Sequence, residues 1–237
     1  MVSEINPGTG GNGEGDKRRP GPVERFLTIM IDPAGTFKDI VERPDFAIPV
    51  VLAVLTALLG IPVAMHSVKN LPPQPGVPPA LMSPAVAGGI AAVSALVMLL
   101  IWWPVRALIF MGLGAALGSR VDFKKSLAVA GYLNYSAFIS SLISAITMLA
   151  LGSPVMPGLG MGLSPEQLAT PRGVLLSNLN IGSLIYIYLS IFGLSELWRT
   201  SRARALAATV IMWALVLAAS AGLAKLGESF RGLVPRQ

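Results

Sequence analysis

The sequence contains no cysteine and one histidine, His66. Without cysteine there can be no disulfide, no thiolate catalysis and no cysteine-based metal site, and a single histidine rules out a metal site built on a histidine pair. Carboxylates are nearly absent from the apolar stretches, and the common nucleophile, phosphate-loop and zinc-protease motifs are missing. We therefore expect no catalytic residues, no metal site and no cofactor.

Charge is scarce as well. Charged residues make up 13% of the 237 residues and apolar residues 53%, and the mean hydropathy is +0.67. A soluble chain of this length has too much surface to cover with so few charges, so we expect a membrane protein. The net charge of +6 favours contact with anionic lipid head groups. The sequence has no basic patch interleaved with aromatic residues, so nucleic acid is not expected as a partner.

Five long apolar stretches account for the composition. They cover about residues 46–66, 84–118, 126–151, 178–198 and 205–224. Each reaches the roughly 20 residues that cross a hydrocarbon core of about 30 Å as a helix, and lipid offers the backbone no other hydrogen-bond partner. The sequence therefore predicts an all-α polytopic protein with a bundle of five transmembrane helices over residues 46–225.

The second stretch contains the segment "WWPVR", which ends at Arg106. If the helix ends at Trp103, the tryptophans form an interfacial belt and Arg106 extends toward the head groups. If the helix runs on to Gly118, Pro104 marks a kink and Arg106 needs a counter-ion. Residues 107–118 are apolar too, which favours the long helix.

The segments outside the spans differ in character. Residues 1–22 are rich in glycine, proline and polar residues and are expected to form a disordered tail. Residues 23–45 are amphipathic, with Asp32 suited to cap a helix that has Pro33 at its first position. This segment either lies in the membrane interface or folds under the bundle as a lid. Residues 226–237 are expected to be a tail, and their end, "LVPRQ", resembles a tag remnant.

Three arginines separate the fourth and fifth stretches. Arginine at mid-bilayer costs about 2.5–3.5 kcal/mol, so this turn is expected in water and head groups on the cytoplasmic side. If the spans alternate, twelve of the eighteen Lys and Arg residues share that side, which predicts a cytoplasmic N-terminus and an external C-terminus. The candidate contacts for lipid head groups and protein partners are Lys124, Lys125, Arg199, Arg202 and Arg204.

Polar residues inside the spans form a second set of candidates. Tyr132, Asn134 and Tyr135 lie about ten residues into the third span, roughly at mid-membrane, and Ser140 follows on a serine-rich face. They serve either helix packing or contact with a ligand. Glu196 lies one turn before the arginines, where it can pair with Arg199 or Arg202 or bind a partner or a proton.

Three segments carry a family resemblance: "IDPAGTFKDIVERPDFAIPV", "VDFKKSLAVAGYLNYSAFISSLI" and "SLIYIYLSIFGLSELWRTSRARALAATVIMW". They resemble the Yip1 family over about residues 25–225. The resemblance implies five transmembrane helices and a cytoplasmic N-terminus. Eukaryotic members are tied to Rab GTPases, but the "DLYGP"-type segment associated with them is absent, so Rab binding is not carried over. The Gly-rich tail and short loops are typical of a prokaryotic member, located in the inner membrane.

Two hypotheses for function follow. In the first, the chain is a non-enzymatic scaffold, accessory subunit or membrane-organising protein whose basic face binds lipids, other membrane proteins or a second copy. In the second, it is a transporter or lipid-translocating protein that uses the polar face of the third span. Five spans cannot divide into two equal halves, which counts against the second hypothesis.

Overall fold

In a computed structural model of the chain, residues 21–69, 78, 83–155, 157–168 and 170–233 are described. Five segments are helical, long and apolar enough to cross a membrane: Ala47–Lys69, Pro84–Ala116, Phe123–Leu151, Ile181–Trp198 and Arg202–Gly222. The predicted all-α polytopic fold is therefore confirmed. The expected disordered tail lies almost entirely outside the described residues.

The first two spans differ in continuity. The first consists of α3 (Ala47–Leu59) and α4 (Ile61–Lys69), which are joined at Gly60. Pro62 follows this joint and lacks the N–H that would continue the helix ladder. The second span is the single helix α5 (Pro84–Ala116), which runs on through Pro104. The long form that we favoured from the sequence is therefore the one observed.

The third span is also divided, into α6 (Phe123–Tyr132) and α7 (Tyr135–Leu151). The fourth is α10 (Ile181–Trp198), which begins at an Asn180 capping box. The short helices α8 (Pro165–Leu168) and α9 (Pro171–Asn178) precede it. The last helix, α11 (Arg202–Leu233), continues beyond residue 225, where a tail was expected.

Two helices precede the spans, α1 (Pro22–Thr28) and α2 (Pro33–Glu42). As the sequence predicts, Asp32 caps α2 by accepting a hydrogen bond from the Gly35 amide, and Pro33 is its first residue. Phe37 and Ile40 are fully buried, and α2 packs against α6 and α10. The apolar face of α2 is thus folded against the bundle.

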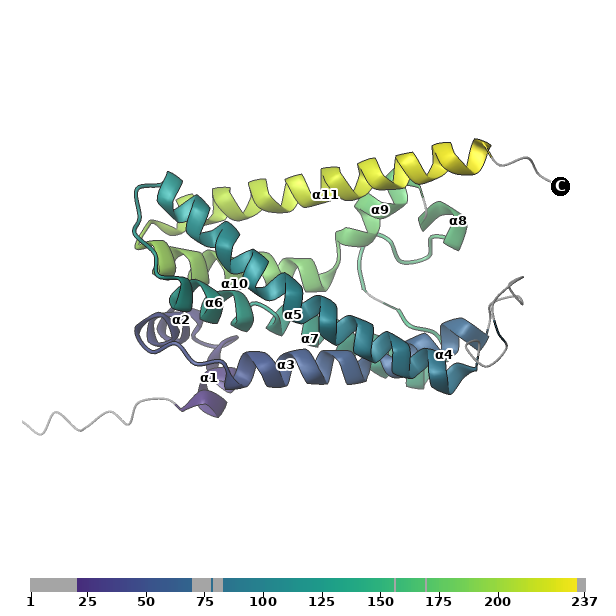
Figure 1. The fold of residues 1–237 in the computed structure, drawn as a ribbon, viewed down its shortest axis with the longest axis horizontal. Coiled ribbons are helices and arrows are strands. Elements are labelled where there is room, and N and C mark those ends of the chain that lie inside the picture. Colours follow the sequence, from purple (N-terminus) through teal and green to yellow (C-terminus); the bar gives the residue numbers. More distant parts are fainter. Residues whose placement is uncertain (1–20, 70–77, 79–82, 156, 169, 234–237) are drawn as a thin grey trace, which may run out of the picture.

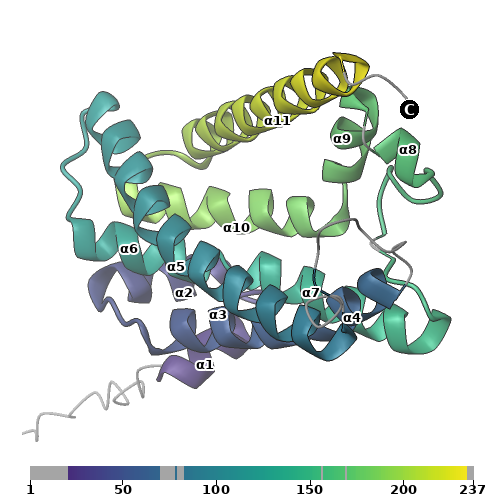
Figure 2. The ribbon, with the colours of Figure 1, turned by 45° about the vertical axis from the view of Figure 1, so that its right-hand side comes forward.

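The helices gather differently at the two ends of the bundle (Figure 1). One end holds α1, α2 and α6 together with the turn between α10 and α11, whereas the other holds α4, α8, α9 and the end of α11. The first described residues and the end of α11 therefore lie at opposite ends. Figure 2 shows α11 running beside α10, with α9 close to its second half.

Large buried side chains concentrate at the end that holds α2 and α6. This core includes Phe37, Phe110, Tyr132, Leu194 and Trp198. Along the rest of the spans many large apolar side chains are exposed, such as Val93, Met98 and Leu215. The outer surface of the helices is therefore suited to contact with lipid, and the tightest protein packing lies at one end.

Candidate functional site

A basic pocket lies at the end of the bundle where the α5–α6 loop meets the α10–α11 turn. Its volume is about 480 Å³. It is lined by Val41, Gly118, Ser119, Arg120, Val121, Asp122, Lys125, Leu197, Trp198 and Arg199. Two of the five predicted contact residues, Lys125 and Arg199, thus come together. Lys124, Arg202 and Arg204 are exposed at the same end but do not line the pocket.

Trp198 holds the two walls of the basic pocket together. Its side chain is buried, and its indole Nε1 donates a 2.9 Å hydrogen bond to the carbonyl of Phe110 in α5. A Cβ at Gly114 would lie 2.8 Å from the indole ring, so only glycine permits this approach. The hydroxyl of Ser119 donates a 2.7 Å hydrogen bond to the Trp198 carbonyl. These contacts fix the turn against the loop, and they give Gly114 a role in helix packing.

Arg199 has an uncommon backbone conformation. Its φ of 50° makes it the one non-glycine residue with positive φ among the described residues. The Thr200 amide donates a 3.0 Å hydrogen bond to the Ser195 carbonyl and so closes the end of α10. Glycine or asparagine usually occupies this left-handed position at a helix end. A side chain here costs about 1–2 kcal/mol, and that of Arg199 lines the pocket.

The basic pocket carries an excess of positive charge. Arg120, Lys125 and Arg199 face one carboxylate, that of Asp122. Asp122 caps α6, and its Oδ1 accepts hydrogen bonds from the amides of Lys124 and Lys125. No carboxylate of the described residues lies within ion-pair distance of the three cations, so their charge is not neutralised by a salt bridge there. Such a pocket can bind an anion.

The expected pairing of Glu196 is not observed. Neither Arg199 nor Arg202 lies within ion-pair distance of its carboxylate in the described part of the chain. The guanidinium of Arg202 instead lies 4.8 Å from the centre of the Phe192 ring. A cation over an aromatic face is a common alternative to an ion pair at an exposed site.

A buried ion cluster that sequence reasoning missed joins the N-terminal helices to the spans. Arg25, which is 5% exposed, donates from Nε to Asp39 Oδ2 at 2.5 Å and also pairs with Asp45. The same guanidinium donates to the carbonyl of Arg43, and the Tyr132 hydroxyl donates a 2.8 Å hydrogen bond to Asp45. We call this set the Arg25 cluster.

The electrostatics of the Arg25 cluster favour the charged arginine. Burial by itself lowers the pKa of Arg25, but the hydrogen bond and charge of Asp39, with further hydrogen bonds to Tyr132 and Asp45, raise that pKa above its ordinary value. From the sequence, Arg25 was counted only as one of the cytoplasmic cations. Its partners lie 14 and 20 residues away, and no local pattern indicates such a pairing.

The Arg25 cluster corrects the expected depth of Tyr132. Tyr132 bonds to Asp45, which precedes the first span, so it lies near the beginning of that span rather than at mid-membrane. The neighbouring Gly131 agrees with this, since a Cβ there would meet Pro49, near the start of α3, at 2.6 Å. Packing of α6 against α2 and α3 brings Tyr132 to that end of the bundle.

Asn134 lies at the break between α6 and α7 and is 2% exposed. Neither its amide nitrogen nor its amide oxygen has a hydrogen-bond partner in the described part of the chain, and the same is true of the buried hydroxyl of Ser190. Tyr135 packs against Phe26 with ring centres 5.3 Å apart, and Ser140 donates to the Ser136 carbonyl. Of the four polar candidates in the third span, Asn134 is therefore the one with fully buried polar atoms that lack a partner among the described residues.

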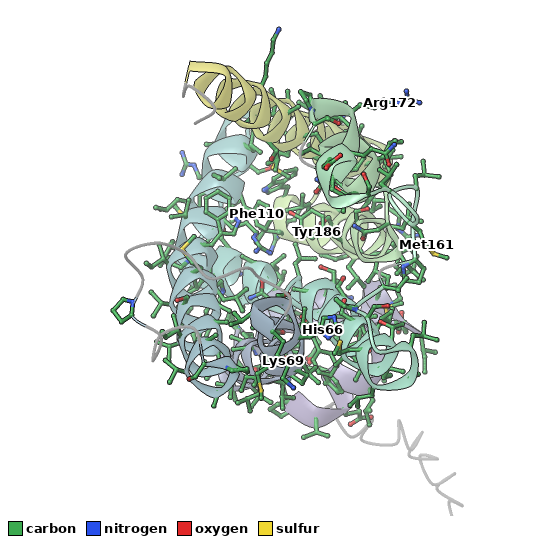
Figure 3. The ribbon with its side chains drawn as sticks, turned by 90° about the vertical axis from the view of Figure 1, so that its right-hand side faces the viewer. His66, Lys69, Phe110, Met161, Arg172 and Tyr186 are labelled. Carbon is green, nitrogen blue, oxygen red and sulfur yellow. The ribbon has the colours of Figure 1, made fainter. Side chains whose placement is uncertain are left out.

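Arg106 lies within α5, without the counter-ion that a long helix led us to expect. No carboxylate of the described residues is within ion-pair distance of its guanidinium. The guanidinium lies 5.8 Å from the centre of the Tyr186 ring, which belongs to α10. Figure 3 shows Tyr186 among the helices, away from the bundle edge where Arg172 projects outward.

Five apolar spans arranged in this way define a polytopic α-helical membrane protein. The model of the Yip1 domain matches residues 27–223, so the chain belongs to the Yip1 family. The match extends from α1 into α11 and includes both walls of the basic pocket. No curated protein and no solved structure matches the chain significantly.

Proposed function

We propose that this protein is a non-enzymatic scaffold or membrane-organising factor whose basic end binds anionic lipid head groups and protein partners. The observation that carries the proposal is the convergence of the α5–α6 loop and the α10–α11 turn around the basic pocket. Lys124, Arg202 and Arg204 are exposed at the same end and extend the positive surface. Under the positive-inside rule this end faces the cytoplasm, and we assign the protein to a prokaryotic inner membrane.

The first helix supports the lipid-binding part of this proposal. Val23 and Leu27 lie one turn apart on one face of α1 and are 67% and 62% exposed, and Ile31, in the turn that follows α1, is 85% exposed. The Arg25 cluster fixes the opposite face to the bundle. An apolar stripe held beside the start of a span is suited to insert into the acyl boundary of the membrane.

The proposal is tested by the lipid that the protein retains. The full chain is extracted with its surrounding lipid in polymer discs, and the lipid is compared with the bulk membrane by mass spectrometry. We expect enrichment of anionic lipid, and a several-fold loss of that enrichment when Lys124, Arg202 and Arg204 are all changed to Gln. The control is Arg172→Gln in α9, which lies at the opposite end of the bundle (Figure 1). Equal lipid profiles in all three proteins contradict the proposal.

A second candidate function, transport of a solute or lipid, is favoured by one observation. Asn134 is a buried amide without a partner at a helix break, and transporters place their binding sites at broken helices. The test is flux through liposomes containing the protein. Flux that is lost in Asn134→Leu but kept in the nearby variant Tyr135→Phe supports transport, and flux no greater than that of empty liposomes rejects it.

A further inference from the structure

We propose that the basic pocket is a binding site for a phosphate monoester, carried either on a lipid head group or on a small soluble molecule. This inference rests on the proposed function, because it names the ligand class of the same basic end. It goes further in assigning a bounded, saturable site where the proposed function needs only a charged surface. Three features of the pocket lead to it: its charge, the backbone of Arg199 and its shape.

The charge of the pocket matches a monoester. Arg120, Lys125 and Arg199 supply three positive charges and Asp122 one negative charge, which leaves an excess of two. A phosphate monoester carries about −1.5 to −2 near pH 7, whereas a phosphodiester carries a single charge. A guanidinium group can donate two parallel hydrogen bonds to the oxygens of one phosphate. The two guanidinium groups of the pocket, those of Arg120 and Arg199, belong to the α5–α6 loop and to the α10–α11 turn. A doubly charged monoester therefore balances the excess charge of the pocket, whereas a diester leaves one positive charge unbalanced.

The backbone of the loop adds donors of a second kind. The amides of Arg120 and Val121 donate no hydrogen bond to any described residue. Main-chain N–H groups in a loop are frequent ligands of phosphate oxygens. The hydroxyl of Ser119 is already used, because it donates to the Trp198 carbonyl. Two residues of the pocket lining, Arg120 and Val121, therefore have main-chain amides without an acceptor among the described residues, in addition to the three cationic side chains of the pocket.

Arg199 points to a role for its side chain in binding. Its positive φ is a conformation in which glycine is free of strain. Strained residues persist where the surrounding structure holds them, and they cluster at binding sites. Glycine would end α10 equally well, so the fold does not require arginine at this position. What arginine adds is a positively charged side chain on a residue that lines the pocket.

The shape of the pocket suits a small phosphorylated molecule. Its volume of about 480 Å³ lies within the range of small-ligand sites. Val41, Val121, Leu197 and Trp198 provide an apolar wall beside the cations. An apolar wall beside cations accommodates the glycerol and first acyl carbons of a lipid as readily as the carbon skeleton of a soluble monoester. The chemistry common to both sources is the phosphate monoester.

The test is a calorimetric titration of the full chain, purified in detergent, with three soluble probes. These are dihexanoyl phosphatidic acid, glycerol 3-phosphate and dihexanoyl phosphatidylglycerol. We expect saturable binding of the monoesters, at least tenfold tighter than that of the diester. If dihexanoyl phosphatidic acid binds more tightly than glycerol 3-phosphate, the source is a lipid, and if the two bind equally it is a soluble molecule. A diester that binds as tightly as the monoesters overturns the proposal.

The decisive variant is Arg199→Gly, which removes the guanidinium and relieves the backbone. We expect it to melt at the same or a higher temperature than the wild type and to bind the monoester at least tenfold more weakly. Arg120→Gln tests the other wall without touching the helix end, and it is expected to show a similar loss. The control is Lys38→Gln, an exposed cation of α2 at the same end that does not line the pocket.

The outcomes separate this inference from the proposed function. The proposed monoester site is overturned if both Arg199→Gly and Arg120→Gln bind the monoester with wild-type affinity, or if the wild type shows no saturable binding. Enrichment of anionic lipid in polymer discs can survive either result, because it depends on the exposed cations outside the pocket. If the lipid enrichment is absent while the monoester still binds, the proposed function is rejected and the assignment of the basic pocket as a monoester site is kept.

Discussion

Arg25 shows how one side chain can determine the arrangement of a whole segment. It is nearly inaccessible, and it binds two carboxylates and a carbonyl from three places in the chain. Because the pKa of Arg25 is raised, its contribution to stability is fully present below its unfolded pKa and is lost only at higher, strongly alkaline pH. Throughout the range in which proteins are handled, disruption of the cluster therefore requires a mutation rather than a change of pH.

Arg25→Met is expected to destabilise the protein by about 3 kcal/mol, because it leaves Asp39 and Asp45 without their buried counter-ion. For a chain of this size, that corresponds to a fall in melting temperature of roughly 6–12 °C. The measurement is a thermal melt in detergent followed by circular dichroism. Lys38→Met, which removes an exposed cation from α2, serves as the control and should melt within about 2 °C of the wild type. A melt of Arg25→Met at the wild-type temperature would mean that the cluster adds no stability.

Tight contacts between helices are set by a few glycines. A Cβ at Gly131 in α6 would lie 2.6 Å from Pro49 and 2.7 Å from Trp103, so three helices meet where only a hydrogen atom fits. The indole of Trp103 also donates a 2.6 Å hydrogen bond to the Leu127 carbonyl. A Cβ at Gly112 in α5, by contrast, would have no neighbour within 4 Å. The two glycines therefore form a matched pair for substitution.

Gly131→Ala is expected to lower stability by about 1–3 kcal/mol, because the added methyl group forces α3, α5 and α6 apart. Gly112→Ala is expected to be neutral or to stabilise by up to about 1 kcal/mol, since alanine favours the helix and meets no neighbour. Both are measured as shifts of the thermal melt in one detergent. Equal shifts for the two variants would show that the close approach at Gly131 is not maintained.

Hydropathy predicted the elements well because a membrane span needs little beyond length and apolar composition. It did not predict the joint at Gly60 or the break at Asn134, since both lie inside apolar runs and depend on local backbone bonding. The basic pocket was anticipated only in part. The sequence singled out Lys125 and Arg199, but their meeting depends on contacts such as Ser119 with Trp198, 79 residues apart.

At the scale of the whole molecule, the two ends of the bundle differ in charge. The helices α1 and α2, the α5–α6 loop with the start of α6, and the α10–α11 turn with the start of α11 share one end (Figure 1), and together they carry most of the cations of the described residues. The positive-inside rule relates such an asymmetry to orientation. The charge asymmetry predicts that the end holding α1 and α2 faces the cytoplasm.

Reporter fusions test the orientation directly. A fluorescent reporter that matures only in the cytoplasm is expected to be active when fused before Pro22 and inactive when fused after Gly227. An alkaline phosphatase that needs the external compartment should give the opposite pattern. Fusion after Arg120 provides an internal check, because that loop should behave like the N-terminus. Activity of one reporter at both ends would contradict an odd number of crossings.

The length of α5 has a consequence for the surrounding bilayer. Its 33 residues extend about 50 Å, against a hydrocarbon thickness of about 30 Å, while the first span has only 23 residues. To fit the whole of α5 into that hydrocarbon thickness, its tilt would have to exceed about 50°, which is beyond the roughly 0–40° that such helices adopt. The two spans pack side by side, so the lipid beside α5 meets a longer apolar helix than the lipid beside the first span. That imbalance favours membranes, or regions of a membrane, whose thickness can vary over the width of a single molecule.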